Sequence, residues 1–435
     1  MRRIGVAATV LTALTVPILP SSPAWAQTQL ATEVEAAKSL MLIGRSSEAR
    51  ALLEQLATSH SGNNEIEFLL GMIAVEAQDY DEAIRRFRSI LARQPGAVRV
   101  RLELARAFFL DRDYENAFRN FQLARAGELP PGVGETIDRF VSLIRQRKTW
   151  SYSLSVSLAP DSNINNGTSA REVNLFGLPF ELSADARERS GVGLAIEGSA
   201  EFAPRISETT RFRMGAAIQR NEYDGTDFDD MTVAVHAGPR IVRDKWDFSV
   251  TGTAFQRRFG RQRLNEGIGA RVEATRYMDS RTALSLGVSA QQIRYPNLPF
   301  QDGGSYSAWA GVVHAVTPES FAIGRIGLAR KEAQSPDLAY HSYSLSVGYY
   351  RDLPAGFSVY AEPGFTDLRH DEPDGFFGLR RHDRLFELRL TVLNRHIVLD
   401  RFTPRIALVL ARRDSNIDIF DYGQRRLEVG VTTAF

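Results

Sequence analysis

The last stretch of the chain, residues 425–435, reads RRLEVGVTTAF and carries the clearest fold signal. Side chains of a β-strand alternate between two faces, so every second residue points the same way. The mostly apolar face carries Leu427, Val429, Val431, Thr433 and Phe435. This alternation, ending on an aromatic residue, is typical of the closing strand of a transmembrane β-barrel, although a strand of a soluble sandwich could look similar. We interpret Leu427, Val429, Val431 and Phe435 as a barrel-assembly signal.

Residues 149–435 repeat the alternation in about 14 segments of roughly ten to fifteen residues, separated by turn-forming residues. The predicted strands start near Trp150, Val192, Thr210, Asp230, Trp246, Glu266, Thr282, Tyr306, Phe321, His341, Phe357, Arg384, Pro404 and Arg425. Connections after even-numbered segments are mostly tight, whereas those after odd-numbered segments are mostly longer and polar, led by residues 161–189. A soluble sandwich has no reason to sort loops by strand parity. The pattern therefore predicts a 14-stranded antiparallel barrel over residues 149–435, with its short turns in the periplasm.

The predicted strands contain charged residues and aromatic residues at different places. Tyr and Trp near strand ends fit the girdles of a membrane barrel, and these are Trp150, Tyr152, Trp246, Tyr277, Tyr349 and Tyr360. Charged or titratable residues alternate with apolar neighbours at Arg271, Glu273, Glu387, Arg389 and His236. We expect this second group to line a wet lumen as paired, solvated side chains rather than to perform catalysis.

The N-terminus has the three parts of a secretory signal peptide over residues 1–26. Arg2 and Arg3 are followed by an apolar run and by the small-x-small site at 24–26. The chain has no Cys, which excludes disulfides and thiolate metal sites and suits an oxidising compartment. Lys+Arg number 53 against 52 Asp+Glu, so the charge balance implies no nucleic-acid partner. No cofactor, metal site or enzymatic activity is expected.

Between residues 27 and 148 the apolar period changes to that of helices, and the segment repeats itself. Tyr80, Ala83 and Phe87 recur 34 residues later as Tyr114, Ala117 and Phe121, and a weaker copy precedes them. A helix–turn–helix repeat of this length, with small residues where helices touch, is typical of tetratricopeptide repeats. We predict a periplasmic helical stack over 27–148, capped by a helix at 134–148.

One tetrapeptide, Asp-Ser-Asn-Ile, occurs at 161–164 and again at 414–417, after the first and thirteenth predicted strands. In a closed barrel the two copies lie two strands apart at the long-loop rim. These side chains could simply cap strand ends by hydrogen bonds to the backbone. The alternative is a gate or client-contact patch formed by Asp161, Asn163, Asn165, Asp414 and Asn416. Spacing around 161–172 also approaches a calcium loop, but Asn166 replaces the required glycine.

The signal peptide, the short tetratricopeptide stack, the barrel opening WSYSLSVSLAPDSNIN at 150–165 and the closing strand together resemble the Slam family, the surface lipoprotein assembly modifiers of Gram-negative bacteria. The resemblance implies an α + β multidomain protein with a periplasmic helical domain and a 14-stranded outer-membrane barrel. It also implies transport of lipoproteins or of haem- and metal-scavenging proteins to the cell surface.

The resulting hypothesis is an outer-membrane translocon that captures a periplasmic client protein and delivers it to the surface. Its expected partners are that client, outer-membrane lipid, the barrel-assembly machinery and periplasmic chaperones. Alternatives are a porin-like channel and a polysaccharide exporter that joins tetratricopeptides to a barrel. The exporter class usually carries a longer helical array than the one found here.

Overall fold

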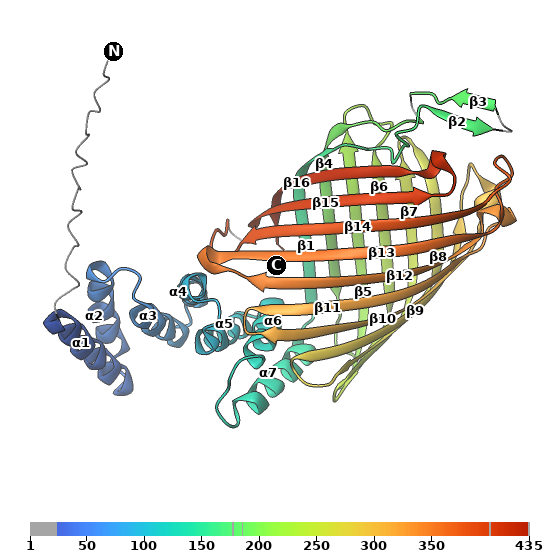
Figure 1. Ribbon diagram of the computed structural model, residues 1–435. Coiled ribbons are helices and arrows are strands. Elements are labelled where there is room, and N and C mark those ends of the chain that lie inside the picture. The colour runs from blue at the N-terminus through green and yellow to red at the C-terminus, as the bar shows by residue number, and fades with distance from the viewer. Residues whose placement is uncertain (1–23, 176–177, 185, 400–401, 434–435) are drawn as a thin grey trace, which may run out of the picture. The chain divides into compact units, whose positions relative to one another are not determined.

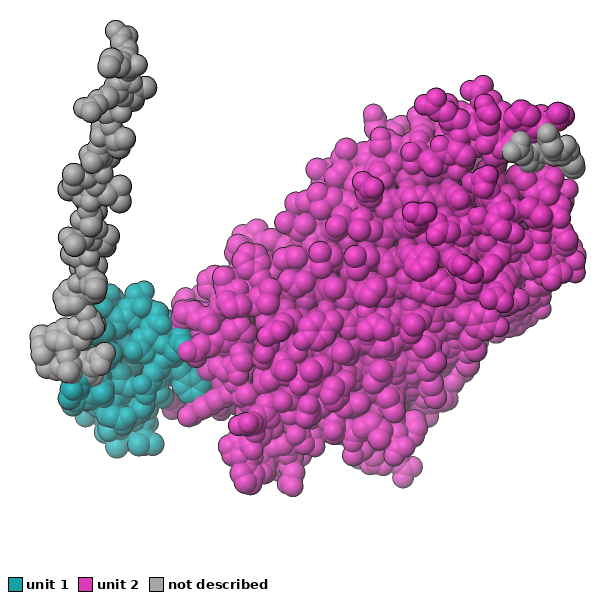
Figure 2. Space-filling view, viewed as in Figure 1, with its two compact units in different colours: residues 1–73 teal, residues 74–435 magenta. Residues whose placement is uncertain are grey.

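The structure is a computed structural model that describes residues 24–175, 178–184, 186–399 and 402–433 of the chain (Figure 1). Most of the predicted signal peptide and Phe435 therefore lie outside the described residues. The chain forms two compact units, residues 1–73 and 74–435 (Figure 2). Among the described residues, no helix is both long and apolar enough to cross a membrane.

The first unit contains helices α1 (Ala24–Leu42), α2 (Ser46–Ser59) and most of α3 (Asn64–Glu76). Its helices pack through one apolar stripe each, and the fully buried members include Ala37, Ala49 and Leu53. The Asn63 side chain accepts hydrogen bonds from the backbone N–H groups of Glu65 and Ile66, which fixes the start of α3.

The second unit begins with helices α4 (Tyr80–Arg93), α5 (Val98–Leu110), α6 (Tyr114–Arg125) and α7 (Val133–Arg147). Asp79 and Asp113 cap α4 and α6, and each carboxylate accepts a hydrogen bond from the N–H three residues on. Ala83 and Ala117 are completely buried where the helices touch. The tetratricopeptide prediction is confirmed, and α7 adds the stacking of Phe140 on Phe121 (centroids 5.0 Å apart).

Fourteen of the described strands close into an antiparallel barrel in which β1 pairs with both β4 and β16 (Figure 1). Their bounds are β1 (Trp150–Asp161), β4 (Gly191–Phe202), β5 (Thr210–Tyr223), β6 (Asp230–Arg243), β7 (Trp246–Phe259), β8 (Gln262–Tyr277), β9 (Thr282–Arg294), β10 (Gly303–Thr317), β11 (Ser320–Lys331), β12 (Tyr340–Asp352), β13 (Phe357–Pro373), β14 (Arg380–Asn394), β15 (Thr403–Ser415) and β16 (Tyr422–Thr432). The predicted strand number and the positions of the strands are confirmed. The hairpin of β2 (Glu172–Leu175) and β3 (Leu178–Glu181), in the long loop after β1, was not predicted, because four residues are too few to show an alternation.

The outer surface of the barrel is apolar, as the alternation predicts. Tyr343, Leu345 and Val347 of β12 expose about half of their surface on this side. Closure into a barrel leaves no strand edge unpaired, which is what a bilayer requires of strands. Since the apolar stripes face mainly outward, the lumen receives most of the polar side chains of the strands.

Two of the predicted girdle residues do not lie in the girdle. Tyr277 contacts the rings and cations of helices α6 and α7, and Tyr360 bonds to Glu362 and lines a lumenal cavity. Both follow the parity of lumen-facing neighbours, so that part of the prediction was wrong. Trp150, Tyr152, Trp246 and Tyr349 are exposed on the outer face, as expected.

Candidate functional site

Helix α6 lies against the lumen at the short-turn end of the barrel. The Phe118 ring meets the Tyr277 ring of β8 edge-on, with centroids 6.1 Å apart. The next residue, Arg119, places its guanidinium 4.2 Å from the centre of the Tyr350 ring of β12. Because both tyrosines point into the lumen from separate parts of the wall, α6 spans part of the mouth.

A cavity of about 460 Å³ remains between α6 and the lumen wall. Its apolar lining comes from Phe118 and Leu123 of α6 and from wall residues such as Val313, Phe321 and Ile323. Apolar side chains facing the inside of a membrane barrel are unusual, since that surface is normally polar. These residues form an apolar surface for α6, so the helix packs on the wall in addition to its ring and cation–π contacts with Tyr277 and Tyr350.

Asp352, at the end of β12, holds helix α5 to the rim of the barrel. Its carboxylate is completely buried and lies 3.0 Å from Arg101 of α5 and 2.8 Å from Arg395 of the turn after β14. The hydroxyls of Tyr350 and Ser358 also donate to it. Burial lowers the pKa of the Arg101 guanidinium, and the charge of Asp352 opposes that effect. Such a buried ion pair adds little net stability, but removing one partner alone is costly because it leaves the other charge buried without a counter-charge.

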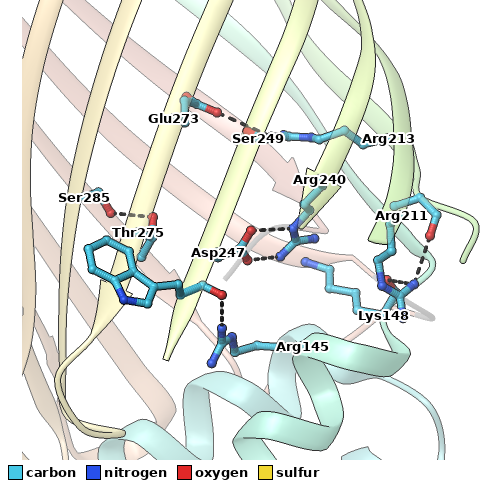
Figure 3. A network of polar contacts seen from close by, with 12 residues as sticks. Arg145, Lys148, Arg211, Arg213, Arg240, Asp247, Ser249, Glu273, Thr275 and Ser285 are labelled. Carbon is cyan, nitrogen blue, oxygen red and sulfur yellow. Dashed lines mark hydrogen bonds and ion pairs between the residues drawn. The ribbon is translucent and has the colours of Figure 1, made fainter. Parts of the chain in front are cut away.

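Helix α7 is held on the opposite part of the rim by arginine bonds to backbone oxygens (Figure 3). Arg145 donates to the carbonyls of Asp244 (3.0 Å) and Trp246 (2.9 Å), which form the turn between β6 and β7. Arg211 of β5 donates to the carbonyl of Lys148, just after α7. Together with α5 and α6, these bonds place the helices of the second unit across the short-turn mouth.

The lumen wall above α7 carries a network of paired charges (Figure 3). Arg213 lies 2.7 Å from Glu201 and 3.4 Å from Glu273, and its guanidinium also donates to Ser249. His236 contacts the same Glu201 carboxylate at 3.1 Å. The prediction that charged residues within strands pair with one another inside the barrel is confirmed for this group.

The first tetrapeptide ties the top of β1 to the top of β16. Asp161 accepts from Gln424 (2.8 Å), and Asn163, completely buried, donates to the carbonyl of Gly423 (3.0 Å). The backbone N–H of Ser162 donates to the carbonyl of Arg425, and the backbone N–H of Arg425 donates to the Ser162 hydroxyl. We call the side chains of Asp161, Ser162 and Asn163 with their partners Gly423, Gln424 and Arg425 the seam latch. Asn165 instead joins the start of its loop to the end, through the backbone of Arg187 and Arg189.

The second tetrapeptide forms the same kind of contact one strand pair away. Asn416 donates to the carbonyl of Arg380 and accepts from the N–H of His382, so it ties β15 to the start of β14. Asp414 is about half exposed and pairs with Arg412. Asn163 and Asn416 thus bind the backbone of different neighbouring strands. The structure does not bring the five candidate residues, Asp161, Asn163, Asn165, Asp414 and Asn416, into a single cluster.

The closing strand β16 presents Leu427 and Val429 to the outside, where each exposes close to half of its surface. Val431 follows the same parity, and Phe435 lies outside the described residues. The Thr433 hydroxyl, which departs from the apolar pattern, accepts a hydrogen bond from the backbone N–H of Leu154 in β1. Whether these residues signal barrel assembly stays a prediction.

Comparison with known proteins is decisive for both parts of this architecture. The family described as "Surface lipoprotein assembly modifier" matches residues 150–435, and its "N-terminal TPR repeats" match residues 49–121. The chain belongs to the surface lipoprotein assembly modifier family. The expected family is therefore confirmed, and the barrel lies in the outer membrane.

The family includes relatives of low identity, each matched over about three-quarters of its length. Surface lipoprotein assembly modifier 1 of Haemophilus influenzae is 21% identical over 373 residues, covering 82% of this chain and 74% of the relative. The protein of the same name from Neisseria meningitidis serogroup B is 22% identical, covering 84% and 75%. Hemophilin secretion modulator of Acinetobacter baumannii is 23% identical over 386 residues, covering 83% and 77%.

Sequence patterns did not identify the residues that close the mouth. Arg101, Asp352 and Arg395 are far apart in the chain, and nothing separates Arg101 from the many other arginines. One signal was present for Asp352, since it begins a tight turn of the predicted short-turn rim.

Proposed function

We propose that this chain is an outer-membrane translocon that captures a client protein in the periplasm and delivers it to the cell surface. The names of its relatives support this reading, because they describe modifiers of surface lipoprotein assembly and of hemophilin secretion. A surface lipoprotein or a secreted haem-binding protein is accordingly the proposed client. Barrel-assembly machinery and periplasmic chaperones are the proposed further partners.

The proposed division of labour follows the predicted domains. Residues 1–26 direct export and are removed, residues 27–148 capture the client, and residues 149–435 form the passage. The observation that carries this proposal is the position of α5, α6 and α7 across the short-turn mouth, where Asp352 binds Arg101 of α5 and Arg145 of α7 binds the turn after β6. A client that binds these helices meets the lumen entrance directly.

The same observation separates the translocon from a porin. A general porin needs an open water path, whereas here α6 seats itself on lumen-facing side chains. Family membership likewise favours protein delivery over polysaccharide export. The proposal includes no catalytic step, since the matched relatives are named for assembly and secretion rather than for a reaction.

The experiment compares cell-surface proteins in three strains: intact, lacking the gene, and carrying the chain without residues 30–148. Proteins are released by external protease and identified by mass spectrometry. We expect specific lipoproteins or secreted proteins to disappear from the surface in both altered strains while the barrel of the shortened chain still shows heat-modifiable migration. An unchanged surface set in the strain lacking the gene would refute the proposal. As an independent measure, purified full-length chain in planar bilayers should stay mostly closed, and the steady conductance of a general porin would contradict the translocon.

A further inference from the structure

Among the described residues, the junction between β1 and β16 has fewer paired positions than any other junction of the barrel. β1 pairs with β16 from Ser155 to Leu158 and again at Asp161, but not at the two residues between. On its other side, β1 pairs with β4 at every residue from Trp150 to Asp161. Pro160 lies inside the interruption, and proline has no N–H to donate to a neighbouring strand. The β6–β7 junction is interrupted in the same way at Gly238 and Pro239, so the seam is distinguished by its small number of paired positions and not by the interruption alone.

One buried hydroxyl next to the gap is left without a hydrogen bond in the described part of the chain. The Ser157 hydroxyl is almost completely buried, and among the described residues it has no hydrogen-bond partner. An unpaired buried hydroxyl costs free energy, so this junction has less to lose on opening than its neighbours have.

The two sides of the seam differ in polarity. On the lumenal side, Glu428 lies 2.9 Å from Arg405 and 3.2 Å from Arg426, directly beside the gap. On the outer side, Leu158 and Val429 expose close to half of their surface or more. An opening here would join a charged lumen to the apolar phase of the bilayer.

The gap lies in the half of β1 that is nearer the long-loop rim, because the strand runs from Trp150 at the helix-covered end to Asp161 at the loops (Figure 1). That half crosses the outer leaflet. A lipoprotein on the cell surface must place its acyl chains in this leaflet, and each methylene left in water or in a polar lumen costs free energy. A lateral opening at this depth lets the chains enter the leaflet without crossing the water above the loops.

We propose that the β1–β16 seam opens at Ala159–Pro160 and releases the lipid anchor of a client sideways into the outer leaflet. The inference rests on the proposed function, since it needs a client that carries an anchor. The seam latch above the gap keeps the barrel closed at the rim, and the bond between Leu154 and Thr433 keeps it closed below.

The experiment locks the seam with a disulfide, which is clean here because the chain has no cysteine. The lock is Leu158→Cys with Val429→Cys, the last pair below the gap. The matched control is Leu158→Cys with Leu194→Cys, which joins the same residue of β1 to β4 instead. Both locks lie at the same depth, face outward and share residue 158, so they compare the two junctions of β1. Cross-linking is measured by the mobility of the unboiled and boiled protein, with and without reductant.

The readout is the set of lipoproteins that protease removes from the surface of the intact strain but not from the strain lacking the gene. We expect oxidation of the seam lock to reduce this set at least tenfold and reductant to restore it, while the control lock leaves it unchanged. A fully cross-linked seam lock with normal surface lipoproteins overturns the inference. Equal losses in both locks also overturn it, since the effect would then not belong to the seam.

A second pair of cysteine substitutions is tested in case the first disulfide does not form or its variant does not fold. Ser155→Cys with Thr432→Cys crosses the seam where the two hydroxyl oxygens lie 2.7 Å apart. Its control, Ser153→Cys with Ser199→Cys, crosses to β4 where the hydroxyl oxygens are also 2.7 Å apart. Failure of the inference and of the proposed function remain distinguishable. If deleting the gene changes no surface protein, the proposed function fails; if deletion matters but seam locks do not, only the lateral route fails.

Discussion

Replacing Asp352 with asparagine tests how firmly the helices are held on the mouth of the barrel. Asp352 is completely buried and faces two guanidinium groups, Arg101 of α5 at 3.0 Å and Arg395 at 2.8 Å. The Asp352→Asn change keeps the shape and removes the charge, so two buried cations lose their counter-charge. Breaking one side of a buried ion pair costs about 3–5 kcal/mol. That corresponds to an increase of roughly 150- to 4,000-fold in the undocked population of the helices.

Limited trypsin digestion of folded protein in detergent measures this population. When opening and closing are fast, the rate of cleavage follows the fraction of open molecules. We expect cleavage between α4 and β1 to accelerate by two orders of magnitude or more in Asp352→Asn. The control is Glu103→Gln, which removes the partly exposed pair with Arg106 from the same helix α5. A surface pair contributes about 0–1 kcal/mol, so that variant should change the rate less than about fivefold.

Combining Asp352→Asn with Arg101→Met sharpens the test. Since the second change removes one of the stranded cations, the two effects should be strongly non-additive. If Asp352→Asn is cleaved no faster than Glu103→Gln, the buried pair does not hold the helices, and the account of the closed mouth is wrong.

Three further changes probe other parts of the chain. Ala83→Leu should lower the free energy of unfolding of the helices by about 1–3 kcal/mol, because Ala83 is completely buried where paired helices touch. Thermal unfolding followed by helical circular dichroism should show a lower unfolding temperature than in the control, Ala51→Leu, which changes an exposed residue. Asn163→Ala removes the hydrogen bonds that this side chain donates to the carbonyls of Gly167 and Gly423, so the loop should be held less firmly by about 1–3 kcal/mol and residues 161–189 should be cleaved faster by protease. Asn416→Ala should leave the cleavage of that loop unchanged, and equal cleavage in both variants would argue against a local latch. Arg145→Ala removes the hydrogen bonds to the carbonyls of Asp244 and Trp246, so we expect more frequent conducting events in planar bilayers than for the control Arg139→Ala, which changes an exposed residue. Unchanged conductance would show that α7 does not help to close the mouth.

The spacing of apolar residues along the sequence was enough to predict the strands and most of the helices. Inward and outward faces follow from alternation within one strand, so Glu273 and Leu427 could be placed without any knowledge of their neighbours. The 34-residue repeat located Ala83 and Ala117 at helix contacts for the same reason. The error at Tyr277 came from weighing residue type above parity: its position in β8 follows that of Glu273 and points inward.

The sequence by itself determined the features that depend on neighbours along the chain, which are the strand number, the loop asymmetry and the 34-residue repeat. Only the tertiary structure decided which distant residues meet. Arg101 and Asp352 are 251 residues apart, and the partners Asn163 and Gly423 are 260 apart. Such pairs are not visible in the spacing of residue types along the sequence, because the partners meet only when the barrel has closed and the helices pack against its rim. The closed mouth and the weak seam are therefore properties of the folded chain.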